Sequence, residues 1–449
     1  MKARTGLAKL AMAALVAMAW LSMGGAPARG EEPVRCRVEV DRGVLPAEGK
    51  QRAVVKITLD APSPPRRTRR PPVNLSVVLD RSASMQGRKL EDAKEAAIEA
   101  VRRLDEGDVF SLVIYDHEVK TLIPAQRVVD KRSIESRIRR ISSRGYTALF
   151  GGVSQGAAEV RRNPDPEYVH RILLLSDGRA NVGPSTPEDL GRLGAALLKE
   201  KISVSTVGVG TDYNEDLMIR LSKESDGNAY FVESSQDLPR IFAAELGDLL
   251  SVVASQVVVE IVCPEGVRPV DIIGRQGRIR GRKAELYLNQ LYGAQEKYAL
   301  LEVEVDPAAP GESREIAEAR VSYTDALTRK PGRAVARAEV KFSEEERAVN
   351  ESANVTVQRD YHLNLNALAK DRAVSLSDKG EADEAVQELK KAGEALREAG
   401  ERFRDPVLLE KAEETEEEAA RIQDEGMSKT RRKALRTDSY QERHQQKKW

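Results

Sequence analysis

A chain of 449 residues with 41% hydrophobic and 32% charged side chains is typical of a globular protein with two or three domains. Basic and acidic residues number 72 each, so the formal net charge is zero and no overall field attracts nucleic acid or an anionic membrane. Aromatic residues make up only 4%, too few for a surface that stacks nucleic-acid bases. We therefore expect no nucleic-acid partner.

The N-terminal segment has the pattern of a secretory signal peptide. Three basic residues precede an apolar run over residues 10–23, and an A-x-A sequence follows at residues 26–28. This run is shorter than the roughly 20 apolar residues that a membrane-spanning helix needs. We predict that residues 1–28 are removed and that the mature chain, without a transmembrane segment, is periplasmic or secreted. An uncleaved N-terminal membrane anchor is the alternative.

Export would place the two cysteines in an oxidising compartment. Cys36 lies near the start of the predicted mature chain, and Cys263 lies near the end of an apolar strand. A disulfide between Cys36 and Cys263 and a pair of buried free thiols are both compatible with this sequence. Two cysteines cannot form a structural zinc site by themselves.

The mature chain begins with a β segment, predicted over residues 33–60 because apolar residues alternate at 34–40 and 53–59. Residues 61–72 are rich in proline and arginine. Prolines and like charges do not pack into a core, so this stretch is predicted to be a linker.

Residues 73–253 alternate between short apolar strands and amphipathic helices. Runs such as Ile172–Leu175 are apolar throughout, which is typical of a parallel sheet covered on both faces. The pattern predicts a doubly wound, mostly parallel α/β domain, with residues 120–128 as an extra antiparallel edge strand. The predicted strands are 74–79, 109–115, 171–175, 202–209 and 229–232, and the predicted helices are 89–104, 147–162, 187–201, 214–225 and 238–250.

Strand patterns return over residues 255–343, and we expect them to form an antiparallel β-sandwich with residues 33–60. The α/β domain would then be inserted in the sandwich, the alternative being a small independent domain at each end. Residues 344–426 have helical periodicity, broken at Lys379-Gly380 and Asp405-Pro406. Residues 427–449 are basic and polar, and we predict a disordered tail.

Five oxygen-bearing side chains occur at the ends of predicted strands or the start of a predicted helix. Asp80, Ser82 and Ser84 follow one strand, Asp177 follows another, and Thr147 opens a helix. The carboxyl ends of parallel strands meet at one edge of a sheet, so these groups are expected to lie together. Carboxylates and hydroxyls suit a hard cation, Mg²⁺ in the first place and Mn²⁺ or Ca²⁺ as alternatives.

This set resembles the metal-ion-dependent adhesion site of the von Willebrand factor type A (VWA) family: D-x-S-x-S, then a threonine, then an aspartate. The stretches 208–214 and 227–232 are also similar to the family, so the resemblance covers about residues 73–250. Ala83 departs from it, because the motif usually has glycine there. The flanking β segments resemble the layout of bacterial exported VWA proteins and of the calcium-activated-chloride-channel-like and inter-alpha-trypsin-inhibitor heavy-chain groups.

The resemblance implies that Ser82, Ser84 and Thr147 ligate the metal directly, while Asp80 and Asp177 act mainly through bound water. Neutral hydroxyls leave much of the positive charge of the ion uncompensated, so it attracts a further anionic oxygen. The implied function is that of a non-catalytic adhesion protein, in which a protein partner offers a Glu or Asp to the metal.

Two other functions remain open from the sequence. The first is a metal-dependent hydrolase, in which the metal would activate water. Against it, the sequence has no G-x-S-x-G nucleophile motif and no histidine beside the two aspartates. The second is a structural scaffold of an envelope complex, in which the metal site is incidental. The same oxygens would also serve simply to cap helices and turns.

Overall fold

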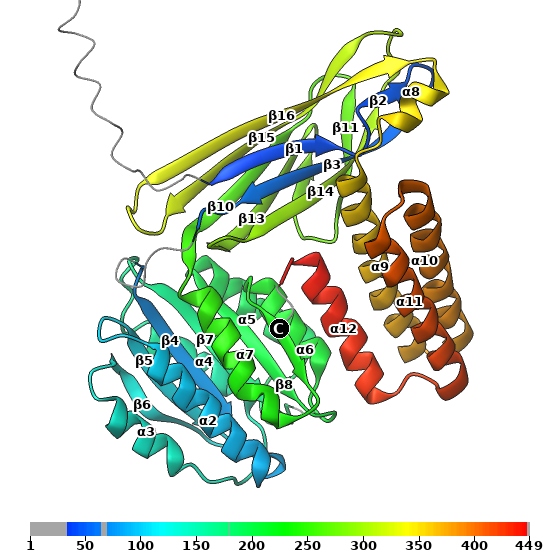
Figure 1. Cartoon of the computed structure of the whole chain (residues 1–449). Helices are drawn as coiled ribbons and strands as arrows, with labels where there is room; N and C mark the ends of the chain where they lie inside the picture. The colour runs from blue at the N-terminus through cyan, green and yellow to red at the C-terminus, as the bar shows by residue number, and fades with distance from the viewer. Residues whose placement is uncertain (1–33, 64–69, 179, 447–449) are drawn as a thin grey trace, which may run out of the picture. The chain divides into compact units, whose positions relative to one another are not determined.

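Three β-sheets and a C-terminal series of helices make up the chain, as the computed structural model in Figure 1 shows. The structure describes residues 34–63, 70–178 and 180–446. The predicted signal peptide and residues 64–69 of the predicted linker lie outside these ranges. Among the described residues, no helix combines the length and the apolar character that a membrane span requires.

The α/β domain is built on a six-stranded sheet in the order β6-β5-β4-β7-β8-β9. All neighbouring strands are parallel except β6, which pairs antiparallel with β5 and is the predicted edge strand. Every residue of β4, β5, β7 and β8 is buried, which explains their nearly continuous apolar sequences. The strands are β4 Val73–Asp80, β5 Val109–Tyr115, β6 Val119–Arg127, β7 Val169–Ser176, β8 Ile202–Val209 and β9 Ala229–Val232.

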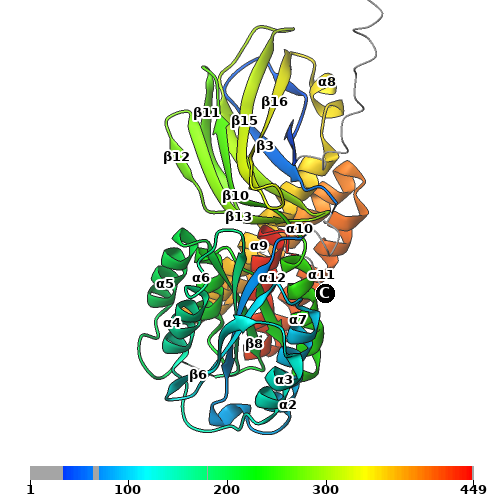
Figure 2. The same cartoon turned by 90° about the vertical axis from the view of Figure 1, so that its left-hand side faces the viewer.

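Helices cover both faces of this sheet, as Figure 2 shows. One face packs against α2 (Arg88–Arg103), α3 (Lys131–Arg139) and α7 (Leu238–Leu249). The other packs against α4 (Leu149–Val160), α5 (Pro187–Lys199) and α6 (Glu215–Glu224). Helix α3 was not predicted, because it is a short charged helix of which only Ile134 and Ile138 are buried.

Two antiparallel sheets form the β-sandwich, and the α/β domain is inserted between its strands β3 and β10. The first sheet has the order β1-β3-β14-β11 and the second β12-β13-β10-β15-β16-β2. Strands from both sides of the insertion therefore share each sheet, which confirms the predicted fold class. The strands are β1 Arg35–Val40, β2 Val44–Pro46, β3 Gln51–Asp60, β10 Val252–Val262, β11 Val267–Ile273, β12 Arg278–Arg280, β13 Lys283–Tyr292, β14 Glu296–Val305, β15 Ser313–Asp325 and β16 Pro331–Ser343.

The two cysteines are free thiols, so the disulfide that the sequence left open is not formed. Cys36 pairs with Leu59 beside the exit of β3 toward the α/β domain. Cys263 follows the last residue of β10, an 11-residue strand that starts at the α/β domain. At about 3.3 Å per residue this strand carries Cys263 to the opposite end of the sandwich, beyond the reach of a disulfide.

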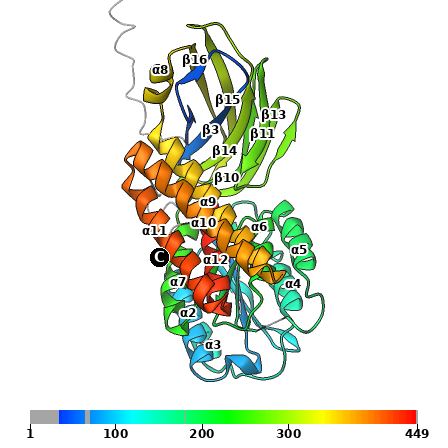
Figure 3. The ribbon, with the colours of Figure 1, turned by 90° about the vertical axis from the view of Figure 1, so that its right-hand side faces the viewer.

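The helical region consists of α8 (Glu346–Glu351), α9 (Val355–Asp378), α10 (Ala382–Phe403) and α11 (Pro406–Glu425), shown from the side in Figure 3. Its helices are interrupted at the two predicted breaks: Gly380 has a positive φ, and Asp405 caps α11. Helix α9 packs Val357 against Val54 and Leu300 on the outer face of the first sandwich sheet.

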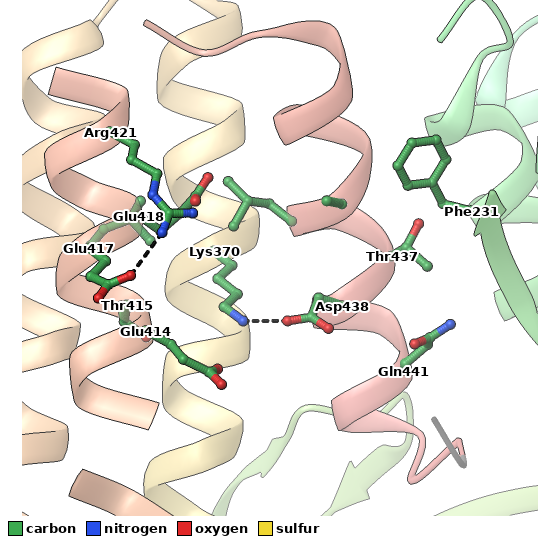
Figure 4. A pocket seen from close by; sticks show the side chains of 13 residues that line it. Phe231, Lys370, Glu414, Thr415, Glu417, Glu418, Arg421, Thr437, Asp438 and Gln441 are labelled. Atoms are coloured by element: carbon green, nitrogen blue, oxygen red, sulfur yellow. Dashed lines mark hydrogen bonds and ion pairs between the residues drawn. The ribbon is translucent and has the colours of Figure 1, made fainter. Parts of the chain in front are cut away.

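The predicted disordered tail is wrong over α12 (Lys429–Arg443), which is a helix that packs between α9 and the α/β domain. Arg432 pairs with Asp216 at 2.6 Å and Asp378 at 2.8 Å, and Lys433 pairs with Glu215. The basic residues are therefore neutralised by tertiary partners that composition does not reveal. Lys370 of α9 pairs with Asp438 of α12 at 2.6 Å, across a cavity of about 520 Å³ lined also by Phe231 (Figure 4).

The end of α12 and the residues that follow it protect the β9 edge of the α/β sheet. The Gln446 carboxamide accepts from Ala229 N at 3.1 Å and donates to Ala229 O at 3.2 Å, and Gln441 Nε2 donates to the same carbonyl at 2.9 Å. These contacts replace the hydrogen bonds that another strand would make with β9. They leave this edge less open to pairing with a second chain.

Arg171, which forms a buried ion pair within the α/β domain, also joins this domain to the sandwich. Arg171 Nη1 of β7 donates to Glu245 Oε1 of α7 at 2.9 Å, and both side chains are at most 1% exposed. The other arginine nitrogen, Nη2, donates to Gln290 Oε1 and Tyr292 OH of β13, each at 2.7 Å. Because the second carboxylate oxygen accepts from Tyr230 OH at 2.8 Å, both charged groups are hydrogen-bonded on several sides.

We expect Arg171→Met to lower the free energy of unfolding by about 3–5 kcal/mol, because it leaves the Glu245 carboxylate buried without its cation. Urea denaturation monitored by circular dichroism would measure the loss. The control is Glu200→Gln, which breaks the exposed Arg161–Glu200 pair and should cost less than about 1 kcal/mol. Equal effects of the two substitutions would contradict this account of the junction.

Candidate metal centre

The two acidic residues of the candidate site lie on neighbouring strands. Strands β4 and β7 pair in parallel with Leu79 opposite Leu175, so Asp80 ends one strand and Asp177 follows the other at the same sheet edge. Both carboxylates are fully buried. Asp80 Oδ2 accepts from Ser176 Oγ at 2.6 Å and Oδ1 accepts from Ser82 N at 2.8 Å. The adjacency expected from a parallel sheet is therefore present.

The two serines connect the carboxylates across the loop after β4. This loop contains the short 3-10 helix η2 (Ala83–Met85). Ser82 Oγ and Ser84 Oγ lie 3.0 Å apart, and Ser84 Oγ donates to Asp177 Oδ1 at 2.7 Å. Ser82 is buried whereas Ser84 is exposed, so solvent reaches the site at Ser84.

Thr147 is brought to the same place by backbone hydrogen bonds between loops. Ala83 N donates to Gly145 O at 3.1 Å, which fixes the Thr147 loop to the loop after β4. On the other side, Thr147 N donates to Asn181 Oδ1 at 2.8 Å, and Asn181 N donates to Thr147 O at 3.1 Å. The structure thus brings all five predicted site residues together.

The oxygens around Gly178 form a cradle that suits a small cation. An ideal Cβ on this glycine would lie 3.0 Å from Thr147 Oγ1, 3.5 Å from Ser84 Oγ and 3.7 Å from Asp80 Oδ2. Three oxygens, two from the end of β4 and its following loop and one from the loop before α4, therefore converge on one point beside Gly178. Hydroxyl and carboxylate oxygens are the ligands of Mg²⁺, Mn²⁺ and Ca²⁺, so these residues fit a hard divalent metal.

Ala83, the departure from the usual motif, fits its position. It begins η2, and it is not among the non-glycine residues with positive φ. Its backbone is therefore one that alanine adopts without strain.

Three further residues shape the site and were missed in the sequence. Ser176 donates to Asp80, Gly178 leaves the cradle open, and Lys89 Nζ of α2 lies 2.5 Å from Asp177 Oδ2. Ser176 and Gly178 flank a predicted ligand, so adjacency was a usable signal. Lys89 gave no such signal, because a lysine in the first turn of an amphipathic helix is ordinarily solvated.

A second acidic group lies beside the site but does not suit a cation. Asp116, His117 and Glu118 place their ligand atoms within 4.8 Å of one another. Asp116 Oδ2, however, already pairs with Arg81 at 2.7 Å and Arg144 at 2.9 Å. Two guanidinium groups on one carboxylate oppose the approach of a metal ion, so Asp116 instead holds the adjacent loops together.

Burial sets the electrostatics of the site in the absence of metal. It raises the pKa of Asp80 from 3.8 to about 6, against the lowering effect of the hydrogen bonds from Ser176 and Ser82. The neighbouring charge of Asp177 raises it further. A buried carboxylate with a raised pKa lacks a compensating positive charge, which a divalent cation would supply.

Comparison with known proteins identifies the domain that carries this site. The family model of the von Willebrand factor type A domain matches residues 74–244. The chain contains a VWA domain. Domains of this family often mediate protein–protein interactions through a metal-ion-dependent adhesion site, whose D-x-S-x-S, Thr and Asp pattern corresponds to the residues described above.

Relatives share the VWA domain over different lengths. An uncharacterised protein of Synechocystis sp. is 29% identical over 267 residues, 57% of this chain and 63% of the relative. Inter-alpha-trypsin inhibitor heavy chain H3 of Homo sapiens is 27% identical over 178 residues, 37% of this chain and 20% of the relative. The chain therefore spans less than two thirds of each of these proteins.

Solved structures share the fold over most of the chain. A von Willebrand factor type A protein from Catenulispora acidiphila has a TM-score of 0.71 at 17% identity, covering 92% of this chain and 97% of its own. The ArnB paralog VWA2 from Sulfolobus acidocaldarius has a TM-score of 0.60 at 15% identity, covering 92% and 99%. This coverage extends beyond the VWA domain into the sandwich and the helices.

The titration of Asp80 leads to a pH-dependent prediction. Its folded pKa of about 6 exceeds the ordinary 3.8, so without metal its ionisation costs stability as the pH rises between these values. Mg²⁺ offsets that cost only when the carboxylate is ionised. We expect Mg²⁺ to raise the Tm clearly at pH 7.5 and much less at pH 5, measured by scanning fluorimetry. In Asp80→Asn, Mg²⁺ should raise the Tm little at either pH. An equal Mg²⁺-induced rise in the Tm of the wild type at both pH values would contradict the prediction.

Gly178→Ala tests the cradle directly. The added methyl group would lie 3.0 Å from Thr147 Oγ1 and crowd the point on which the oxygens converge. We expect the affinity for Mn²⁺ to fall at least about tenfold, measured by electron paramagnetic resonance. The matched control is Gly247→Ala in α7, where an added Cβ meets nothing within 4 Å. Unchanged Mn²⁺ affinity in Gly178→Ala would exclude this position for the metal.

Proposed function

We propose that this protein is a non-catalytic adhesion protein that docks an acidic side chain of a protein partner through a divalent metal. Asp80, Ser82, Ser84, Thr147 and Asp177 would hold the ion, with Mg²⁺ as the physiological cation and Mn²⁺ or Ca²⁺ as substitutes. The partner would supply a Glu or Asp oxygen as the remaining ligand. The observation that carries the proposal is the convergence of three oxygens on the open point beside Gly178.

The presence of neutral hydroxyls among the proposed metal ligands supports the docking of an acidic side chain. Mg²⁺ prefers near-octahedral coordination and keeps several waters, so the hydroxyls of the cradle would leave positions for exchangeable water. Neutral hydroxyls do not cancel the charge of the ion, and a carboxylate of the partner replaces one water at a gain in electrostatic energy. Ser84 is exposed and Tyr146, next to Thr147, is 69% exposed, so a partner can reach the site.

The surroundings favour rigid presentation of the metal. The three loops are hydrogen-bonded to one another at Ala83, Thr147 and Asn181. The carboxylates are held by Ser176, Ser82 and Ser84. A site fixed in this way binds a partner without paying an ordering cost.

The proposal includes export. The basic residues, the apolar run over 10–23 and the A-x-A sequence are the pattern of a secretory signal peptide. The partner would accordingly be a protein of the cell envelope or outside the cell.

The test is a metal-dependent capture experiment with the mature protein. Wild-type protein and Asp177→Ala would be immobilised and exposed to envelope extract in Mg²⁺ or in EDTA, and bound proteins would be identified by mass spectrometry. We expect a partner that is captured only by the wild type in Mg²⁺, because Asp177 connects the metal to the sheet. Binding of the purified partner should fall at least about a hundredfold in Asp177→Ala.

The matched control is Glu167→Ala, an exposed acidic substitution in the loop before β7, at the opposite end of the strand from Asp177. It should bind as the wild type does. Substituting single acidic residues of the captured partner should reproduce the loss at one position. Equal capture by the wild type and Asp177→Ala, or capture that persists in EDTA, would contradict the proposed function.

A further inference from the structure

Lys89 is an unexpected positive charge within the candidate metal centre. Its Nζ lies 2.5 Å from Asp177 Oδ2, and its side chain is 36% exposed while Asp177 is fully buried. Lys89 belongs to the first turn of α2, so the segment that carries Ser82 and Ser84 also delivers this ammonium group. The same Nζ lies 3.7 Å from an ideal Cβ on Gly210, in the loop after β8.

The lysine and the cradle use different oxygens of the same carboxylate. Asp177 Oδ1 accepts from Ser84 Oγ, on the cradle side, whereas Oδ2 accepts from Lys89. Lys89 is not among the atoms nearest to the cradle point beside Gly178. A divalent ion at the cradle and the ammonium group can therefore be held at the same time, with the carboxylate of Asp177 between them.

The charges of the site then do not cancel when metal is bound. The carboxylates of Asp80 and Asp177 balance a divalent ion, and Lys89 adds one further positive charge. Nearby Arg81 and Arg144 pair with Asp116 and Glu118, so that group adds no net charge. The metal-loaded site would carry a net positive charge that comes from Lys89.

We propose that Lys89 is a specificity-determining residue that keeps the metal-loaded site cationic, and so selects an anionic ligand at the expense of metal affinity. This inference rests on the proposed function of the site. In the metal-free protein, Lys89 compensates the buried Asp177. In the metal-loaded protein it repels the ion and attracts the carboxylate of the partner.

The inference predicts opposite effects of one substitution on metal and ligand. Lys89→Met should bind Mn²⁺ about tenfold more tightly, because a repulsive charge near the ion is removed. Acetate, the probe for a partner carboxylate, should bind the Mn²⁺-loaded variant about tenfold more weakly. The metal-free variant should have a lower Tm, because Asp177 stays buried without a counter-charge. Paramagnetic resonance, water-proton relaxation and scanning fluorimetry measure the three quantities.

Two variants serve as controls. Lys89→Arg retains the charge and should resemble the wild type in all three measurements. Arg88→Met removes the neighbouring charge, which is 70% exposed and contacts Asp92 at 3.6 Å, and should leave both affinities unchanged. If Lys89→Met does not fold without metal, Lys89→Gln takes its place with the same expectations, because its amide still donates to Asp177.

The outcomes separate this inference from the proposed function. Unchanged Mn²⁺ and acetate affinities in Lys89→Met, in a protein whose Mn²⁺ binding depends on Asp177, would overturn the role of Lys89 and leave the proposed function standing. Weaker Mn²⁺ binding in Lys89→Met would also overturn it, because Lys89 would then support the metal. Absence of Asp177-dependent Mn²⁺ binding in the wild type would overturn both.

Discussion

Two carboxylates buried side by side constrain the candidate metal centre of this molecule. Asp80 ends β4 and Asp177 follows the neighbouring parallel strand β7, and burial together with the nearby charge of Asp177 opposes the ionisation of Asp80. The surrounding groups relieve this cost: serine hydroxyls and a backbone N–H donate to the carboxylates, and Lys89 supplies a positive charge. A divalent cation would complete the compensation, so its binding would also stabilise the folded protein.

Strand β7 connects this site with the junction to the rest of the chain. Arg171 near its start takes part in the buried ion pair with Glu245 and in hydrogen bonds to the sandwich, while Asp177 follows its last residue. The strand is buried throughout, so it links the two ends rigidly. The edge of the VWA domain that carries the candidate metal centre is thus held by the same element that anchors the domain to the sandwich.

Much of the fold and most of the site could be predicted from the sequence, because both depend on local patterns. Continuous apolar runs such as Ile172–Leu175 indicated buried parallel strands, and the strand ends indicated where Asp80 and Asp177 would meet. Helix α3 was missed because only two of its residues face the core. Lys89 was missed because its partner lies 88 residues away, on another element.

The sequence by itself determined the alternation of strands and helices, the VWA motif and the breaks between the C-terminal helices, since each depends on residues close together in the chain. Tertiary structure decided which charges are paired and which segments are ordered. The basic residues of α12 are neutralised by Glu215, Asp216 and Asp378, and Cys36 and Cys263 lie at opposite ends of the sandwich. Composition records charges and thiols, but only folding brings their partners within reach or keeps them apart, because electrostatic pairing and covalent bonding act over a few ångströms.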